Sequence, residues 1–158
     1  MKISDISITD RQQRAENLFL EGYNCCQAVV LAFEDLLPVG REELLALTSG
    51  FGGGMGRMRE VCGAVSGMTI LAGFISPGSD PSNKAAKTAN YALVQQFAAS
   101  FRKQKGSIIC RELLGLRAEE RSAPEPSDRN PAYYHVRPCQ ANVGLAARIV
   151  AEYLKSLS

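Results

Sequence analysis

Four cysteines that lie far apart in the sequence are the residues best suited to chemistry. They are Cys25, Cys62, Cys110 and Cys139. A cysteine thiolate attacks disulfides and oxidants and also binds soft metal ions, so all four are candidates both for catalysis and for metal ligation. No two of them form a Cys-x-x-Cys pair, the spacing typical of thioredoxin-type sites and zinc ribbons. Any site that uses these cysteines must therefore be assembled by the fold.

Cys26 and His135 are two further residues that could take part in such a site. Cys26 directly follows Cys25, and successive residues of a helix point about 100° apart, so the two thiols would face different directions. We interpret Cys26 as a packing residue, with a backup thiol as the alternative. His135 is the only histidine, and Pro138 makes its approach to Cys139 non-helical. We interpret His135 as a surface residue, with a nitrogen ligand or a base as the alternative.

A glycine-rich segment, residues 50–56, precedes Cys62 and reads Gly-Phe-Gly-Gly-Gly-Met-Gly. It lacks the Lys-Ser/Thr of a phosphate-binding P-loop. Glycine allows the backbone to approach another group closely, and successive backbone N–H groups can form a concave site for an anion. We expect such a site around the Cys62 sulfur or a bound ligand, which makes Cys62 the predicted attacking thiol. The glycines expected to form it are Gly52, Gly53, Gly54 and Gly56.

Helices must position these cysteines, because apolar residues recur every three or four positions along most of the chain. The clearest stripe belongs to the last helix and consists of Val143, Ala147, Val150, Leu154 and Leu157. No segment alternates apolar and polar residues as a half-buried strand does. The region 117–137 contains three prolines among charged residues and predicts a long loop. The sequence thus predicts an all-α bundle of about five or six helices, with one glycine-rich and one proline-rich loop.

Helix signals place each of the four cysteines in the first turn of a helix. Asn24 is a good N-cap for a helix that starts at Cys25, and Pro138 suits the first turn of a helix that carries Cys139. The other two cysteines follow the glycine-rich segment and a serine cap. Unpaired N–H groups and the helix dipole stabilise a thiolate in a first turn. We therefore predict that the four sulfurs converge on one pocket.

Length and charge narrow the classes of function. With 158 residues the chain fits one domain, residues 1–158, which can bury a core without disulfides. The net charge of +2 argues against a nucleic-acid partner, and no apolar run is long enough for a membrane partner to be expected. Residues 1–13 lack the apolar stretch of a signal peptide, so we expect a cytoplasmic protein with reduced thiols. Apolar helix faces leave a homodimer open.

The four cysteines and their neighbours resemble the C_GCAxxG_C_C family, whose members are described as redox-active. The matching stretches are Gly22-Tyr23-Asn24-Cys25, Cys62-Gly63-Ala64-Val65-Ser66-Gly67, Cys110-Arg111-Glu112-Leu113-Leu114-Gly115 and Cys139. One departure is that Val61, not glycine, precedes Cys62, while Gly63 follows it. The resemblance implies a bacterial or archaeal protein with redox-active or metal-binding cysteines. It implies no particular substrate.

Three functions remain open at this point. The first is thiol–disulfide or electron-transfer chemistry, in which one thiolate attacks, another resolves, and electrons pass to a redox partner protein or a small oxidant. The second is a metal ion or iron–sulfur cluster held by the four separated thiolates. The third is a structural zinc site or a helical interaction module without catalysis. The absence of metal-ligand spacing favours the first, and whether the protein is an enzyme stays open.

Overall fold

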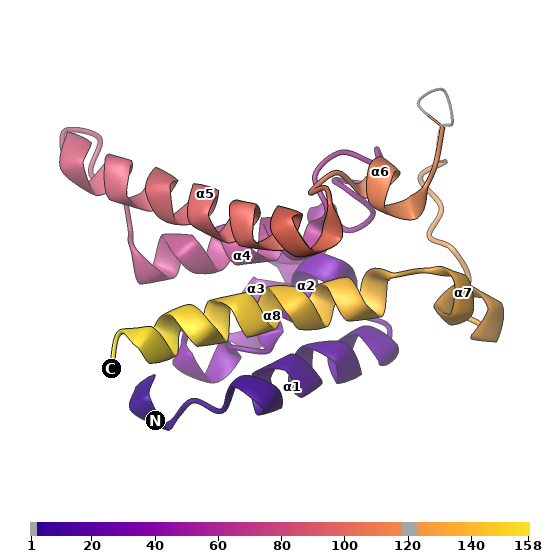
Figure 1. Ribbon diagram of the computed structural model, residues 1–158, viewed down its shortest axis with the longest axis horizontal. Coiled ribbons are helices and arrows are strands. Elements are labelled where there is room, and N and C mark those ends of the chain that lie inside the picture. The colour runs from indigo at the N-terminus through magenta and orange to yellow at the C-terminus, as the bar shows by residue number, and fades with distance from the viewer. Residues whose placement is uncertain (1–2, 118–122) are drawn as a thin grey trace.

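The computed structural model describes residues 3–117 and 123–158, and this part of the chain is all-α, as the sequence predicts (Figure 1). Its eight α-helices are α1 (Ile8–Leu20), α2 (Cys25–Leu31), α3 (Arg41–Thr48), α4 (Gly63–Ile75), α5 (Lys84–Lys105), α6 (Cys110–Leu114), α7 (Pro131–Val136) and α8 (Cys139–Ser156). Short 3-10 helices are η1 (Ile3–Asp5), η2 (Glu34–Leu36) and η3 (Ser49–Phe51). The described residues contain no strand, only an isolated antiparallel β-bridge between Val61 and Ile109.

Helix α8 runs through the centre of the bundle and packs against α1, α2, α4 and α5. In Figure 1, α4 and α5 lie on one side of α8 and α1 lies on the other. Four residues of its predicted apolar stripe are buried, whereas Leu157 follows the helix and is exposed. The start of α8 lies at the same end of the molecule as α6 and α7, and the two chain termini lie at the opposite end (Figure 1).

Short helices account for the main differences from the sequence-based expectation. The predicted count of about five or six helices is lower than the eight observed in the described residues. Helix α7, which has only six residues, is too short to show a repeated apolar spacing. The region 117–137 is not a loop throughout, since α7 lies within it. Asn130 caps α7 and Pro131 occupies its first turn. Residues 118–122 of this region lie outside the described residues.

One hydrophobic cluster joins side chains of α1, α2, α4, α5 and α8. A charged residue also lies inside the bundle: the Arg11 side chain is 1% exposed, and its guanidinium binds the Asp35 carboxylate at 2.5 Å and the Ala32 carbonyl at 2.8 Å. These bonds supply partners for a buried charge, which would otherwise be costly. Among the described residues, no helix has the length and apolar character needed to cross a membrane.

Candidate functional site: a cysteine pocket

Helix starts position all four separated cysteines. Cys25, Cys110 and Cys139 are the first residues of α2, α6 and α8. Cys62 is the N-cap residue of α4 and directly precedes that helix. The predicted placement of each cysteine at the beginning of a helix is therefore confirmed. First-turn N–H groups have no partner within their own helix, so those that lack another acceptor are available to polarise a nearby sulfur.

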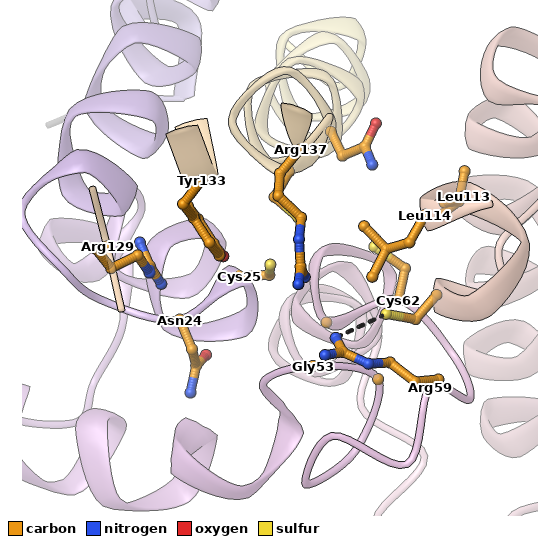
Figure 2. A pocket seen from close by; sticks show the side chains of 15 residues that line it. Asn24, Cys25, Gly53, Arg59, Cys62, Leu113, Leu114, Arg129, Tyr133 and Arg137 are labelled. Carbon is orange, nitrogen blue, oxygen red and sulfur yellow. Dashed lines mark hydrogen bonds between the residues drawn. The ribbon is translucent and has the colours of Figure 1, made fainter. Parts of the chain in front are cut away.

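All four cysteines line one small pocket of about 60 Å³, here called the cysteine pocket (Figure 2). The structure thus brings together thiols that the sequence keeps apart. All five cysteines of the chain are free thiols. Cys26 does not line the pocket; its side chain is 0% exposed and belongs to the hydrophobic core, as expected for a packing residue. The catalytic roles of the four pocket cysteines remain predictions at this point.

The isolated β-bridge holds Cys62 and Cys110 next to each other. The Cys62 N–H donates to the Ile108 carbonyl at 2.8 Å, and the Cys110 N–H donates to the Glu60 carbonyl at 2.6 Å. These bonds join the segment that precedes α4 to the segment that leads into α6. A bridge of this length leaves no alternating pattern in the sequence, so only the folded chain reveals it.

Asn24 fixes the start of α2 and therefore the place of Cys25. Its side-chain oxygen accepts a hydrogen bond from the Gln27 N–H at 2.9 Å, and the Gln27 side chain accepts one from the Asn24 N–H at 3.0 Å. This reciprocal arrangement is a capping box. The Asn24 amide group also donates to the Ser49 carbonyl at 3.1 Å. One side chain thus connects a cysteine-bearing helix to the beginning of the glycine-rich segment.

The glycine-rich segment winds in a left-handed turn beside the cysteine pocket. Residues 53–57 all have φ between 59° and 73°, a conformation that costs a non-glycine residue roughly 1–2 kcal/mol. Glycine is also required for space: a Cβ at Gly54 would lie 2.6 Å from the Cβ of Cys110. A Cβ at Gly63 would lie 3.0 Å from the Cβ of Cys25. These glycines therefore let the loop and α4 approach the cysteines closely.

The N–H groups that act on the Cys62 sulfur come from α4, not from the glycine-rich segment. They belong to Ala64 and Val65 and lower the pKa of Cys62. Within the loop, the Gly56 N–H donates instead to the Gly50 carbonyl at 2.8 Å. Gly53 and Gly54 line the cysteine pocket, and Gly52 and Gly56 line a neighbouring pocket. The structure thus gives these glycines a packing role, and ligand binding by them stays a prediction.

The thiols of Cys25 and Cys139 interact as a pair at the starts of α2 and α8. Hydrogen bonding within this pair is the main cause of two opposite shifts: it raises the pKa of Cys25 well above its ordinary value and lowers the pKa of Cys139 to about 7. Burial opposes the lower pKa of Cys139. The positive charges of Arg137, Arg129 and Arg59 favour it. Above pH 7, the pair therefore keeps a proton on Cys25 and a negative charge on Cys139.

Burial keeps the other two pocket thiols protonated. Cys62 is 6% exposed, and burial raises its pKa to about 12 although two first-turn N–H groups act in the opposite direction. Burial also raises the pKa of Cys110, which is 8% exposed, against the effect of Arg59. The Arg59 guanidinium donates to the Cys110 sulfur at 3.7 Å (dashed line in Figure 2). These environments favour Cys139, rather than the predicted Cys62, as the thiolate at neutral pH.

Five further side chains line the cysteine pocket and were not identified by sequence patterns. They are Arg59, Arg129, Arg137, Tyr133 and Asn142. Arg137 and Asn142 carry a weak signal, because they lie two residues before and three residues after Cys139. Residues three apart on a helix share a face, which places Asn142 beside Cys139. Arg129 and Tyr133 come from the proline-rich region, and only the tertiary structure brings them to the pocket.

Asn142 is the most deeply buried polar side chain of the pocket, with 2% exposure. Its Oδ1 atom has no hydrogen-bond partner among the described residues. A buried polar atom without a partner costs about 1–3 kcal/mol, and such atoms are rare in folded proteins. Tyr133 is another uncharged polar residue that lines the pocket, and burial raises its pKa to about 12, so its hydroxyl stays neutral. Both groups are available to a molecule bound in the pocket.

Two predictions about ligation remain to be compared with the structure, one for His135 and one for a metal ion held by the cysteines. His135 is exposed and does not line the cysteine pocket, which agrees with its interpretation as a surface residue. Within residues 3–117 and 123–158, no group of three or more His, Cys, Asp or Glu side chains is arranged to hold a metal ion. Metal ligation by the four pocket cysteines therefore stays a prediction from the sequence.

Comparisons with known proteins agree with the cysteine pattern. The model of the family described as "Putative redox-active protein (C_GCAxxG_C_C)" matches residues 23–153. This range contains the four pocket cysteines and every other side chain that lines the pocket. No curated protein and no solved structure matches the chain.

Proposed function

Because this chain belongs to the C_GCAxxG_C_C family, we propose that it carries out thiol–disulfide exchange through Cys139 and Cys25. The position of both thiols in one pocket at two helix starts, together with the lowering of the pKa of Cys139 to about 7, supports this most directly. An attacking thiol works best when its pKa is near the ambient pH, because a higher value leaves little thiolate and a lower value weakens the nucleophile. Both residues are partly exposed, as attack on a substrate requires.

The proposed reaction begins when the Cys139 thiolate attacks one sulfur of a disulfide R–S–S–R. The substrate S–S bond breaks, a mixed disulfide forms between Cys139 and one half of the substrate, and the other half leaves as RS⁻. Cys25 then gives its proton to a departing thiolate and attacks the Cys139 sulfur. A Cys25–Cys139 disulfide forms and the second thiol leaves. The protein has lost two electrons, and the substrate disulfide has been reduced to one thiol and one thiolate, which takes a proton from solvent.

The surroundings of the pair suit these steps. Three arginines stabilise the negative charge on Cys139 before attack and on the leaving thiolate after it. Cys62 and Cys110, with raised pKa values, would stay protonated and would not compete for the substrate at neutral pH. A reducing thiol or a redox partner protein would then restore the dithiol. We place this cycle in the cytoplasm, where such reductants are abundant.

Disulfide mapping tests the proposal. The reduced protein is treated with one equivalent of hydroxyethyl disulfide, and its peptides are examined by mass spectrometry. We expect a Cys25–Cys139 disulfide and the release of two small thiols per chain. Cys139→Ala should abolish the release. Cys26→Ala is the control, because Cys26 lies in the core outside the pocket. Full release by Cys139→Ala, with a disulfide between Cys62 and Cys110, would assign the chemistry to that pair instead.

A metal or iron–sulfur centre is the second candidate, because one pocket is lined by four cysteines, the ligand number of such centres. Bound thiolates must be deprotonated, so a metal would have to overcome the raised pKa values of Cys25, Cys62 and Cys110. The visible spectrum and zinc content of freshly purified protein distinguish the cases. A brown protein would support an iron–sulfur cluster, and stoichiometric zinc would support a structural site.

A further inference from the structure

A second and larger pocket, here called the outer pocket, adjoins the cysteine pocket. Its volume is about 330 Å³, which falls within the range of small-molecule sites. The walls that the two pockets share are formed by Asn24, Gly53, Arg59, Arg129, Tyr133 and Arg137. A molecule in the outer pocket would therefore touch the same arginines that lower the pKa of Cys139.

Four arginines line the outer pocket, and none of the Asp or Glu side chains that the structure describes lines it. They are Arg57, Arg59, Arg129 and Arg137. These cations repel one another: burial and the positive charges of Arg59 and Arg137 lower the pKa of Arg57, while Tyr133 and Glu125 act in the opposite direction. A cavity wall with several cations concentrates negatively charged molecules.

Neutral groups hold two of these guanidinium groups in place. Arg129 donates to the Phe19 carbonyl at 2.8 Å and the Tyr23 carbonyl at 3.1 Å, and it lies 4.1 Å from the centroid of the Phe19 ring. Arg137 lies 5.0 Å from the centroid of the Tyr133 ring. Carbonyls and aromatic rings fix the orientation of a guanidinium but do not cancel its charge. Both cations can therefore still attract an anion.

The backbone of the glycine-rich segment places the other two arginines. Arg57 and Arg59 have φ of 63° and 62°, which is unfavourable for residues with a side chain. Such strain is found mostly at functional sites, where the surrounding structure enforces it. Here it accompanies side chains that reach the pockets: Arg57 donates to the Ala123 carbonyl at 2.5 Å and the Ser127 hydroxyl at 3.2 Å, and both arginines line the outer pocket.

We infer that the outer pocket binds the negatively charged group of a small disulfide while the sulfur atoms of that molecule reach Cys139 in the cysteine pocket. This inference rests on the proposed function and names its substrate class, low-molecular-weight disulfides that carry carboxylates. The volumes of the two pockets fit this placement of the substrate. The cysteine pocket has room for only a few atoms, and the outer pocket has room for the rest of a small molecule. The Asn142 Oδ1 atom, which has no partner among the described residues, is then available to accept a hydrogen bond from any donor group that the substrate places beside Cys139.

Three disulfides of similar size and different charge test the inference. They are dithiodipropionate, which is anionic, hydroxyethyl disulfide, which is neutral, and cystamine, which is cationic. For each disulfide, the rate at which it oxidises the protein is divided by the rate at which the same disulfide reacts with a small free thiol. This ratio removes differences in intrinsic reactivity between the three disulfides. At low salt we expect dithiodipropionate to react about tenfold faster than hydroxyethyl disulfide, and cystamine to react slowest. The difference should shrink as salt increases, because salt screens charge.

Arg57→Gln is the most informative variant, because Arg57 lines the outer pocket but not the cysteine pocket. We expect it to reduce the rate ratio of dithiodipropionate to hydroxyethyl disulfide by about threefold or more. Arg148→Gln is the matched control. Arg148 lies on α8 outside both pockets and pairs with Glu152 at 2.8 Å, so its removal should leave the ratio unchanged.

The outcomes separate the inference from the proposed function. Equal corrected rates for the three disulfides, or an unchanged ratio in Arg57→Gln, would overturn the anionic substrate class and leave thiol–disulfide exchange in place. Oxidation by none of the three would instead reject the exchange reaction. In that case, calorimetric titration of Cys139→Ala with dithiodipropionate decides the anion site. Binding that is lost with Arg57→Gln supports the site, and the absence of binding overturns it.

Discussion

The interaction between the thiols of Cys25 and Cys139, which line the same pocket, connects the first residue of α2 to the first residue of α8. It gives two identical side chains different protonation states, because it lowers the pKa of one and raises the pKa of the other. Exchange chemistry needs this difference, since one sulfur must attack as a thiolate and the other must wait as a thiol. The arginines that line the pocket add to this difference, because their positive charges also lower the pKa of Cys139.

The pH dependence of alkylation should identify Cys139 as the reactive thiol. Because the pKa of Cys139 is lowered from its ordinary value of 9.0 to about 7, its thiolate forms as the pH rises through about 7. We expect the rate of iodoacetamide labelling at Cys139, followed by peptide mass spectrometry, to reach half its maximum near that pH. Cys62, with a pKa raised to about 12, should stay unlabelled. Half-maximal labelling of Cys139 near pH 9 would contradict the proposed environment.

Arg137→Gln should make Cys139 less reactive at neutral pH. Of the three arginines that lower the pKa of Cys139, Arg137 has the largest effect, and glutamine keeps much of its length without the charge. We expect the midpoint of the labelling profile to move to higher pH and the rate at pH 7 to fall about threefold or more. Arg148→Gln again serves as the control. An unchanged profile in Arg137→Gln would mean that the charge of Arg137 does not lower the pKa of Cys139.

The sequence was sufficient to predict the helical class and the cysteine-bearing helix starts, because caps and apolar spacing are local signals. It also identified Cys26 as a packing residue from its position next to Cys25. The choice of attacking sulfur depends on more than local pattern. The sequence favours Cys62 for its glycine neighbours, and that choice stays a prediction, whereas burial raises the pKa of that thiol to about 12 and supports our proposal of Cys139. Burial and the positions of distant arginines are tertiary properties, and no local pattern encodes them.

The proline-rich region, residues 117–137, is a second case in which local sequence could not predict the contribution to the pocket. Its prolines predict an irregular loop, and this prediction missed α7, which has only six residues. Arg129 and Tyr133 reach the cysteine pocket from this region. Neither residue has a spacing relative to a cysteine that would suggest a shared site. Their contribution depends on how the region folds back onto α1, through the Phe19 and Tyr23 carbonyls.

Gly54→Ala should destabilise the protein and disturb the cysteine pocket. The new Cβ would lie 2.6 Å from the Cβ of Cys110 and 2.8 Å from the Glu60 nitrogen, and φ of 73° adds backbone strain. We expect the free energy of unfolding in urea to fall by about 2 kcal/mol or more.

Gly73→Ala is the matched control for that change. Gly73 lies in α4, and a Cβ there would meet no atom within 4 Å. Alanine is a better helix former than glycine, so this variant should be stabilised by about 0.5–1 kcal/mol. Equal stability changes in the two alanine variants would show that the loop yields at Gly54 without cost.

Limited proteolysis should cut the wild-type protein first within the region 117–137, which we expect to act as a mobile cover over the cysteine pocket. Residues 118–122 of this cover lie outside the described residues. In the described part, Arg129 ties the cover to the end of α1 through two carbonyls. Tyr133 and Tyr134 pack against Phe19, with ring centroids 6.4 Å and 6.2 Å away. These contacts should shield both tyrosines from chymotrypsin.

Arg129→Gln should loosen this attachment and expose Tyr133 and Tyr134 to chymotrypsin. The change removes two charge-assisted hydrogen bonds and a cation–π contact at 4.1 Å, so we expect cleavage at these tyrosines to be about tenfold faster than in the wild type. Tyr91 of α5 provides an internal reference, because its side chain is 61% exposed but its backbone is helical. If Tyr133 and Tyr134 resist cleavage in Arg129→Gln as well as Tyr91 does, the region is packed structure and not a cover.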